Sequence, residues 1–423
     1  MGMVRIGGGA EKDIGRGADA IIIGHVLERF IPAGLRTVDL RKIVIGGEGP
    51  YDAGRWAEAT GDLRRASMPL SESPHVNLLE QHDRLGERLF ERATFEQTPY
   101  FKNAAHAVRL CGSYFGHRTP EGIAAQARSF VCLYGRTANG DPTEVEFTYR
   151  RRHSAPTSLP VVRETLTPNT FQVTDGHHRL AVAWTMGRRE VAATAVPPRA
   201  PTTLQSLVLA CAQTRGRREL YQPIDGLEFN GGWNIVRRCD DRLGMMLAFL
   251  AAVGRPISAL SVLDAACSYG WFVNEFSKRG AAATGVDTDP AALKAGRIAY
   301  GLRAEQTVQS DLHAFLSICG RTWDVVLLLS VLHHFVLNPK RGRPDELLRK
   351  IDRVTGTCLF IDTGQAHERW WRGTLAQWDN DFVADYIRRH TSFTQVIPLG
   401  TDADYAGPYR QNYGRTLFAC LRS

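Results

Sequence analysis

Several features that would define other classes of protein are missing from this 423-residue sequence. No apolar run approaches the ~20 residues that cross a bilayer, so no membrane-spanning helix is expected. The residues near the start, among them Glu11, Lys12 and Asp13, include no apolar core of a signal peptide. The eight cysteines have no paired spacing, which is typical of reduced thiols. Together these absences predict a cytoplasmic protein with no membrane partner.

A strong excess of charge in one region is also missing. The formal net charge is +8, but residues 255–423 hold 20 Lys plus Arg against 17 Asp plus Glu, which leaves 32 against 27 for residues 1–254. Short basic clusters occur at 150–152 and 215–218, without the interleaved aromatic residues that stack on bases. This pattern indicates solvated faces and argues against a nucleic-acid partner.

What is present fits two domains, for which 423 residues are long enough. In the C-terminal half, Ser261–Gly270 begins as an apolar strand and becomes a tight turn of small residues. A second strand, Ala282–Val286, follows, and Trp323–Leu329 has the nearly unbroken apolar character of a central parallel strand. With the apolar segments Phe393–Leu399 and Arg415–Leu421 at the end, this order predicts an α/β domain with a doubly wound sheet.

Candidate cofactor contacts lie at the ends of the first two strands. Asp264 is followed at alternate positions by Ala266, Ser268 and Gly270, and Asp287 ends the second strand, where a carboxylate can accept hydrogen bonds from two ribose hydroxyls. The Gly-x-Gly-x-x-Gly spacing that lets a pyrophosphate approach the backbone is missing. This favours a thioether nucleoside cofactor over a nicotinamide dinucleotide. Asp264 would also suit a helix-capping acid.

These features, over about residues 225–423, resemble the class I S-adenosylmethionine-dependent methyltransferases. The resemblance implies a Rossmann-like sheet of seven strands with an antiparallel last strand, S-adenosylmethionine as cofactor and a small-molecule acceptor. Ala266 and Ser268 stand where the family usually has glycine, so we expect a less tight turn.

The same resemblance implies further site residues. Asp311 stands where the family contacts adenine, although it would equally begin the expected helix Leu312–Ile318. Ser330, after the fourth strand, joins the cofactor contacts. His333 and His334, on the loop after that strand, are candidate general bases because an imidazole titrates near neutral pH. The alternative is that the two histidines only shape the cofactor pocket.

A second signal lies in the N-terminal half, where Phe171–Gly187 is typical of a strand, a polar turn and a helix. The turn consists of Asp175, Gly176, His177, His178 and Arg179. Imidazoles, a guanidinium and free amides at a helix N-terminus suit an anion or a phosphate. No Cys or carboxylate cluster at ligand spacing stands nearby, so no metal site is predicted. The alternative is a satisfied polar cluster that ties the helix to the sheet.

This turn resembles that of the ParB/sulfiredoxin-like superfamily, and Leu35–Ile43 fits the opening strand and short helix of that family. The resemblance implies an N-terminal α+β domain that binds a nucleotide or its phosphates, and some relatives are phosphotransferases or act on nucleic acid. Glu48 is then a candidate catalytic carboxylate, or else part of a glycine-rich surface turn. The predicted boundaries are 1–30 for a flexible leader, 31–200 for this domain with a helical insertion at about 75–155, 201–254 for a linker and cap helices, and 255–423 for the methyltransferase domain.

The segment before the methyltransferase core is expected to help build the acceptor pocket. It begins with a predicted helix, Thr203–Arg215. The candidates for substrate contact are Trp233, Arg237 and Asp241. Core packing explains Trp233 as well, and the aromatic stretch Glu368–Arg372 is a second candidate wall.

The sequence therefore predicts a methyltransferase for a small polar or sugar-like acceptor, with a ParB-like N-terminal domain. Three alternatives remain open: a nucleotide- or nucleic-acid-binding regulator, a bifunctional enzyme whose N-terminal half is a phosphotransferase, and a nicotinamide oxidoreductase. The even charge argues against the first and the missing glycines against the third. The oligomeric state is not predicted.

Overall fold

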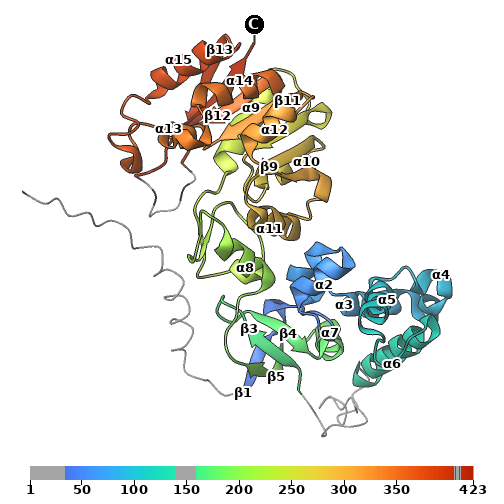
Figure 1. Ribbon diagram of the computed structural model, residues 1–423. Coiled ribbons are helices and arrows are strands. Elements are labelled where there is room, and N and C mark those ends of the chain that lie inside the picture. Colours follow the sequence, from blue (N-terminus) through green and yellow to red (C-terminus); the bar gives the residue numbers. More distant parts are fainter. Residues whose placement is uncertain (1–33, 139–158, 404, 406–408, 410, 423) are drawn as a thin grey trace, which may run out of the picture.

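The computed structural model describes residues 34–138, 159–403, 405, 409 and 411–422, which form two sheet-containing parts joined by a middle segment (Figure 1). The predicted leader 1–30 and the end of the predicted helical insertion lie outside the described residues. Within the described part of the chain, none of the helices combines the length and apolar character that a membrane crossing requires.

The N-terminal part is built on a five-stranded sheet of mixed direction. Its strands, in spatial order, are β1 (Gly34–Asp39), β5 (Glu190–Val196), β3 (Val161–Glu164), β4 (Phe171–Asp175) and β2 (Ile43–Val44). β1 runs antiparallel to β5, whereas β2 runs parallel to β4. Helix α7 (His177–Thr185) starts directly after β4. The strand, turn, helix and strand expected in this region are therefore observed, while the superfamily resemblance stays a prediction.

Helices fill most of the chain between β2 and β3. They are α2 (Ala53–Thr60), α3 (Pro74–Leu85), α4 (Arg92–Phe95), α5 (Pro99–Cys111) and α6 (Pro120–Ala138). α3 and α5 each begin with a proline, and the preceding Ser73 and Thr98 accept a hydrogen bond from an amide of the first turn. The apolar faces of α3, α5 and α6 join one core with the sheet, so this helical segment is not a separate unit.

The C-terminal part contains a seven-stranded sheet. Its strands, in spatial order, are β10 (Thr307–Gln309), β9 (Ala282–Asp287), β8 (Ser261–Ala265), β11 (Trp323–Leu329), β12 (Thr355–Asp362), β14 (Thr416–Leu421) and β13 (Gln395–Thr401). The first five are parallel, and β14 is antiparallel to both neighbours. The predicted doubly wound sheet with its antiparallel last strand is confirmed. The strand order reverses between β8 and β11, where such sheets bind ligands.

Helices cover both faces of this sheet, and buried apolar residues of the central strands point to both faces. One face carries α12 (Leu312–Ile318), α14 (Pro344–Val354) and α15 (Asn380–His390), and the other carries α9 (Asp240–Ala252) and α10 (Trp271–Lys278). In β11, Val326 and Leu328 join the first core, whereas Val325 and Leu327 join the second. The apolar run of this strand is therefore buried on both faces, as predicted.

The middle segment packs against α11 (Pro290–Tyr300) of the C-terminal part. It consists of α8 (Thr203–Ala210), β6 (Glu219–Leu220), the short 3-10 helix η5 (Leu227–Phe229) and β7 (Asn234–Ile235). The predicted helix Thr203–Arg215 is wrong beyond Ala210. Cys211 is extended, and the Thr214 hydroxyl donates to the carbonyl of Val208, so the chain folds back at the end of α8.

A matched pair of helix glycines tests the close approach of α11 to the turn after β8. A Cβ added at Gly296 in α11 would overlap the carbonyl oxygen of Tyr269, whereas one added at Gly244 in α9 would meet no atom within 4 Å. We expect Gly296→Ala to lower the free energy of unfolding by about 1–3 kcal/mol through overpacking. Gly244→Ala should raise it by about 0.5–1 kcal/mol through helix propensity. Urea denaturation measures both, and equal effects of the two substitutions would contradict the described packing.

Candidate functional site

The turn after β8 has a left-handed backbone at three alternate positions. The φ angle is 72° at Ala266, 54° at Ser268 and 80° at Gly270. Only glycine adopts this region without strain. The amides of Ala266 and Cys267 donate to the carbonyl of Val286 at 2.8 and 3.0 Å, which fixes the turn against β9. Ala266 and Ser268 thus take the left-handed conformation that glycines would take, and the less tight turn expected there stays a prediction.

Two carboxylates belong to this turn and the adjacent strand end. Asp287 accepts hydrogen bonds from the amide of Ser268 at 2.7 Å and from that of Asp289 at 2.9 Å. Asp264 is buried, and its Oδ2 has no hydrogen-bond partner among the described residues. Burial and the nearby Asp287 raise the pKa of Asp264 to about 7. A buried polar atom without a partner is costly, so Asp264 marks a place for a ligand group.

Asp311 and Ser330 are held by protein partners. The Asp311 carboxylate caps α12 by accepting from the amide of Ala314 at 2.9 Å, as the capping alternative predicts. Ser330 has a φ of 59°, and its amide and hydroxyl both donate to Asp362 Oδ1, at 2.8 and 2.9 Å. A cofactor contact by Asp311 would therefore use its other carboxylate oxygen, and one by Ser330 would use its backbone.

His333 and His334 lie in a helix, α13 (Leu332–Leu337), and not on a loop as expected. His333 is buried, and its Nδ1 accepts a hydrogen bond from the amide of Gly364 at 3.1 Å. In the neutral ring the proton is then on Nε2. His334 is exposed. Desolvation and nearby Arg341 lower the pKa of His334 to about 4, so this ring is neutral at physiological pH.

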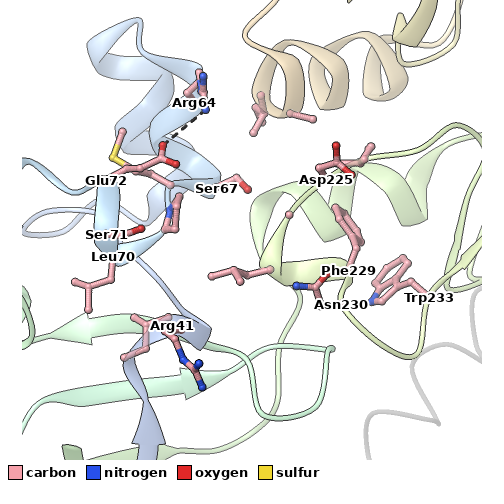
Figure 2. Close-up of a pocket in the computed structure, with 18 of the residues that line it drawn as sticks. Arg41, Arg64, Ser67, Leu70, Ser71, Glu72, Asp225, Phe229, Asn230 and Trp233 are labelled. Carbon is pink, nitrogen blue, oxygen red and sulfur yellow. Dashed lines mark ion pairs between the residues drawn. The ribbon is translucent and has the colours of Figure 1, made fainter. Parts of the chain in front are cut away.

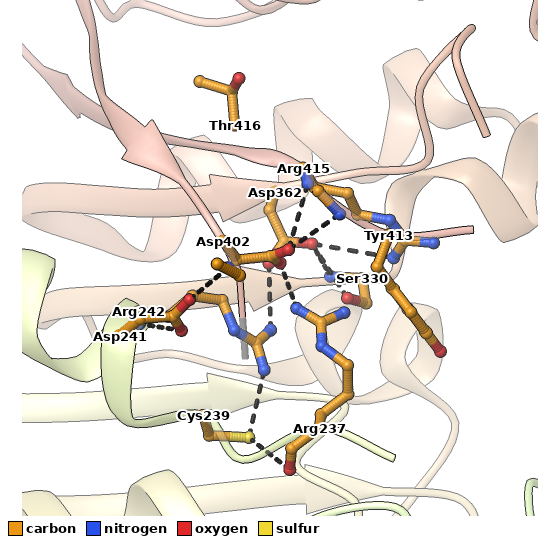
Figure 3. Close-up of polar contacts among 12 residues, drawn as sticks. Arg237, Cys239, Asp241, Arg242, Ser330, Asp362, Asp402, Tyr413, Arg415 and Thr416 are labelled. Atoms are coloured by element: carbon orange, nitrogen blue, oxygen red, sulfur yellow. Dashed lines mark hydrogen bonds and ion pairs between the residues drawn. The ribbon is translucent and has the colours of Figure 1, made fainter. Parts of the chain in front are cut away.

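A network of buried ion pairs lies at the carboxyl ends of β11 and β12 (Figure 3). The pairs are Arg237 with Asp402, Arg242 with Asp362, and Arg415 with Glu368. The Arg415–Glu368 pair is bidentate, with both N–O distances at 2.8 Å. Burial alone would raise the pKa of Asp362, but the guanidiniums of Arg242, Arg237 and Arg415 hold it below its usual value. All three arginines of the network are therefore neutralised by carboxylates.

The predicted substrate contacts fall in different places. Arg237 is fully buried, pairs with Asp402 and lies 4.3 Å from the centre of the Tyr413 ring, and its contact with substrate stays a prediction. Asp241 accepts from the amide of Ala403 at 2.6 Å. Trp233 is buried and donates to the Thr167 hydroxyl at 2.9 Å, as the packing alternative predicts.

The aromatic stretch between β12 and β13 lies beside the histidine pair. The rings of Trp371 and His333 are 5.4 Å apart, and the Trp371 indole donates to Glu368 at 3.1 Å. Trp370 is about half exposed. This side of the sheet therefore presents an exposed indole close to the carboxyl end of β11.

A second site lies in the N-terminal part, where a pocket of about 820 Å³ is lined by the glycine-rich segment 46–49 and by residues 172–179. His177 accepts from the amide of Gly46 at 3.2 Å, which joins the two segments. Arg179 donates to Asp175 at 3.1 Å. The structure thus brings the predicted turn and Glu48 into one pocket.

Three residues of this second site were not found from the sequence. Arg65 is buried, donates to the Gly46 carbonyl at 2.9 Å and pairs with Glu48 at 3.4 Å. Asn103 donates to Glu48 at 3.0 Å. His75 stacks on His177 with ring centres 5.4 Å apart. None of the three stands in a motif, and all reach the pocket through contacts between distant segments.

The imidazoles of this pocket are uncharged. Burial lowers the pKa of His177 and of His178 to about 3, and it lowers the pKa of His75 well below its usual range. Tyr100 Oη and His178 Nε2 are 2.9 Å apart, so His178 also has a protein partner. An anion at this turn would meet backbone amides and guanidiniums rather than imidazolium cations.

A third cavity, of about 640 Å³, lies between the N-terminal part, the middle segment and α11 (Figure 2). Trp233 lines it, together with residues 67–72 and 224–230. No residue of the predicted cofactor turn is among its lining residues.

Comparison with known proteins is consistent with this geometry. Residues 263–357 match the family model described as a methyltransferase domain. A comparison with curated proteins found no match. Residues 263–357 therefore form a methyltransferase domain, for which S-adenosylmethionine is the cofactor.

Solved methyltransferase structures are similar to this chain at low identity. The bifunctional kinase-methyltransferase WbdD is 20% identical, over 52% of this chain and 46% of that one, with a TM-score of 0.40. Magnesium protoporphyrin IX methyltransferase (ChlM) from Synechocystis PCC 6803, with bound SAM, is 18% identical over 43% and 79%, with a TM-score of 0.32. The methyltransferase domain of bacterial CtHen1 is 16% identical over 43% and 97%, also at 0.32. The chain matches just under half of the length of WbdD.

The residues present fit this cofactor. The unpartnered oxygen of Asp264 suits the ammonium of the methionine part, and each oxygen of Asp287 keeps a lone pair for a ribose hydroxyl. Gly285 lets β9 approach the turn, because a Cβ there would lie 2.6 Å from Cys267 Sγ. Binding of S-adenosylhomocysteine tests the contact between Asp264 and the ammonium, and this measurement needs no methyl acceptor.

The raised pKa of Asp264 predicts pH-dependent cofactor binding. An ammonium favours the ionised carboxylate, so S-adenosylhomocysteine should bind about tenfold more weakly at pH 6 than at pH 8. Binding near pH 7 should release a proton, measurable by calorimetry in buffers of different ionisation enthalpy.

Asp264→Asn is the control and should remove this pH dependence. In the free protein a raised carboxyl pKa means that the folded state binds more protons than the unfolded state. The stabilising contribution of Asp264 should therefore be present below pH 4 and be lost as pH rises towards 7. A pH-independent affinity in the unsubstituted protein would show that Asp264 does not meet the ammonium.

Proposed function

We propose that the protein transfers the methyl group of S-adenosylmethionine to a small polar or sugar-like acceptor. The observation that carries this proposal is the left-handed turn 264–270 beside the Asp287 carboxylate, within the segment that matches the methyltransferase domain family. When bound, the cofactor supplies a methyl group on a sulfonium, and transfer is an in-line displacement in which alignment is the main contribution of the enzyme.

In this proposal the residues around the turn bind and orient the cofactor. Asp264 holds the ammonium, Asp287 holds the ribose hydroxyls, and the segment ending at Asp311 lies against the adenine. The amide of Ser310 donates to the carbonyl of Asp287 at 3.0 Å, which supports placing that segment beside the ribose site. Ser330 acts as a positioning residue through Asp362, to which both its amide and its hydroxyl are bonded.

His334 is the better candidate for accepting a proton from the acceptor. The Nδ1 lone pair of His333 is already used by the amide of Gly364, and its Nε2 carries the proton. In this proposal the Nε2–H group of His333 is available as a hydrogen-bond donor to the methyl acceptor. His334 is exposed and neutral at physiological pH, so a ring nitrogen can accept a hydrogen bond from the acceptor, while its lowered pKa makes it a weak base.

Substitution of Asp287 tests the cofactor site directly. Two hydrogen bonds from ribose to a charged acceptor are worth about 1.5–3 kcal/mol each, so Asp287→Ala should weaken S-adenosylhomocysteine binding at least 100-fold. Isothermal titration calorimetry measures the affinity, and thermal unfolding checks that the variant is folded. Because two backbone amides also lose their acceptor, a modest loss of stability is expected. Unchanged affinity in the folded variant would rule out this placement.

A second candidate function belongs to the N-terminal pocket, which we propose binds a nucleotide and transfers its terminal phosphoryl group to a hydroxyl. Support comes from Glu48, which shares the 820 Å³ pocket with the start of α7. Burial raises the pKa of Glu48, which moves this carboxylate towards the range useful for a general base. Its Oε1 is held by Asn103 and Arg65, and Oε2 is available to a substrate hydroxyl.

Calorimetric titration with ATP tests this second function independently of the first. Arg179→Ala should weaken ATP binding at least tenfold, because the guanidinium lies beside the amides that would hold the phosphates. Arg136→Ala, on helix α6, is the control and should leave ATP affinity unchanged. S-adenosylhomocysteine binding should be unchanged in both variants. No ATP binding by the unsubstituted protein would reject a nucleotide at this turn.

A further inference from the structure

The cavity between the N-terminal part and α11 is separate from both sites described above. One wall comes from residues 67–72 and the facing wall from residues 224–230, while Ile298 and Ala299 close it on the side of the C-terminal part. Ile298 is eight residues after Pro290, the first residue of α11, so the cavity lies on the order of 12 Å along that helix from the ribose site. Its volume of about 640 Å³ is within the range of small-molecule sites.

Three polar side chains that line the cavity, two of them exposed, have no partner among the described residues. Among the residues that the structure describes, no hydrogen bond or ion pair is made by the side chains of Asp225, Asn230 and Ser71, all three of which line the cavity. In Figure 2, Asn230 extends from one wall towards the space of the cavity, whereas the Ser67 hydroxyl on the facing wall donates a hydrogen bond to Glu228. A carboxylate, an amide and a hydroxyl together offer both acceptors and donors.

Apolar and aromatic side chains form the rest of the lining. Phe229 and Trp233 are buried with ring centres 5.0 Å apart, and Leu70 lines the cavity from the opposite wall. The Trp233 indole is anchored by its hydrogen bond to Thr167, so the ring has a fixed orientation. The lining therefore combines fixed rings with unengaged polar groups, which suits a ligand whose faces are apolar and whose edges carry hydroxyls.

The charges of the cavity argue against an anionic ligand. Arg41 is bonded through two nitrogens to Asp39, at 3.0 and 2.6 Å, and Arg64 lies 3.8 Å from Glu72. Each guanidinium of the lining thus already has a carboxylate neighbour. The Asp225 carboxylate, in contrast, forms no ion pair with any cation among the described residues. Among the described lining residues, a phosphate or carboxylate on the ligand would therefore compete with Asp39 and Glu72 for these guanidiniums.

We infer that this cavity binds a neutral sugar ring, alone or as one unit of a glycan. The Asp225 carboxylate and the Asn230 amide bind vicinal hydroxyls, and the Phe229, Trp233 and Leu70 side chains contact the C–H faces of the ring. This site is additional to the methyl-transfer site and does not depend on the proposed acceptor, because its lining excludes the cofactor turn.

The test is calorimetric titration of the full chain with methyl α-D-glucopyranoside and methyl α-D-mannopyranoside, with glucose 6-phosphate as the anionic comparison. Saturable millimolar or tighter binding of a neutral glycoside is expected, with weaker binding of the phosphorylated sugar. Asn230→Ala should weaken glycoside binding at least fivefold and Asp225→Ala at least tenfold.

Asn234→Ala is the matched control. Asn234 is an exposed asparagine four residues after Asn230 in the same segment and does not line the cavity, so its loss should leave glycoside affinity unchanged. S-adenosylhomocysteine affinity should be the same in all variants, which shows that they are folded and separates this result from failure of the methyl-transfer proposal. No saturable glycoside binding, preferential binding of glucose 6-phosphate, or equal effects of Asn230→Ala and Asn234→Ala would overturn the inference.

Discussion

The buried ion-pair network at the carboxyl ends of β11 and β12 is the constraint on which the C-terminal site depends. It joins elements that are far apart in the sequence: the start of α9, the end of β12, the loop after β12 and the segment before β14. Its members are Arg237, Arg242, Asp362, Glu368, Asp402 and Arg415. Removing charges from water is expensive, and such pairs persist only where hydrogen bonds satisfy the remaining atoms. Here Asp402 also accepts two backbone amides and Glu368 accepts the Trp371 indole, so the network fixes backbone as well as side chains.

This network accounts for the backbone conformation of Ser330, contributes to the pKa of Asp264 and helps to position the hydrogen-bond partner of His333. Asp362 holds Ser330 in its left-handed conformation through two hydrogen bonds. Arg242 pairs with Asp362 and also lowers the pKa of Asp264, although not enough to offset burial and Asp287. The loop that carries Glu368 brings Gly364 to His333. The chemistry proposed for the turn and for the histidine pair thus has a common support in a few buried charges.

The two candidate sites use burial in opposite ways. At the C-terminal site, one buried carboxylate oxygen is left without a protein partner, and a cationic ligand group would complete it. In the N-terminal pocket, Glu48 already has Arg65 and Asn103, and Arg179 has Asp175. Ligand binding there would have to reorganise existing pairs or use backbone amides, which is why the cofactor assignment is better supported than the nucleotide proposal.

The sequence predicted those features that are set by residues close together in the chain, and it missed those that are set by contacts between distant segments. The helix expected at Leu312–Ile318 and the strand expected at Trp323–Leu329 are both observed with those bounds, because a capping acid and an unbroken apolar run are local patterns. The burial of Arg237 could not be predicted, since its partner Asp402 is 165 positions away. His75 and Arg65 reach the N-terminal pocket in the same way. The positions that the sequence missed are those whose role is set by a contact between distant segments.

The middle segment links the two halves through α11, and this arrangement bears on whether the sites act independently. The same helix begins beside the ribose site, lines the cavity with Ile298 and forms the Lys294–Glu58 ion pair with α2 of the N-terminal part. Gly296 in its middle lies against the backbone of the cofactor turn, where no Cβ would fit. Helix α11 therefore packs against the cofactor turn, the cavity and helix α2 at the same time.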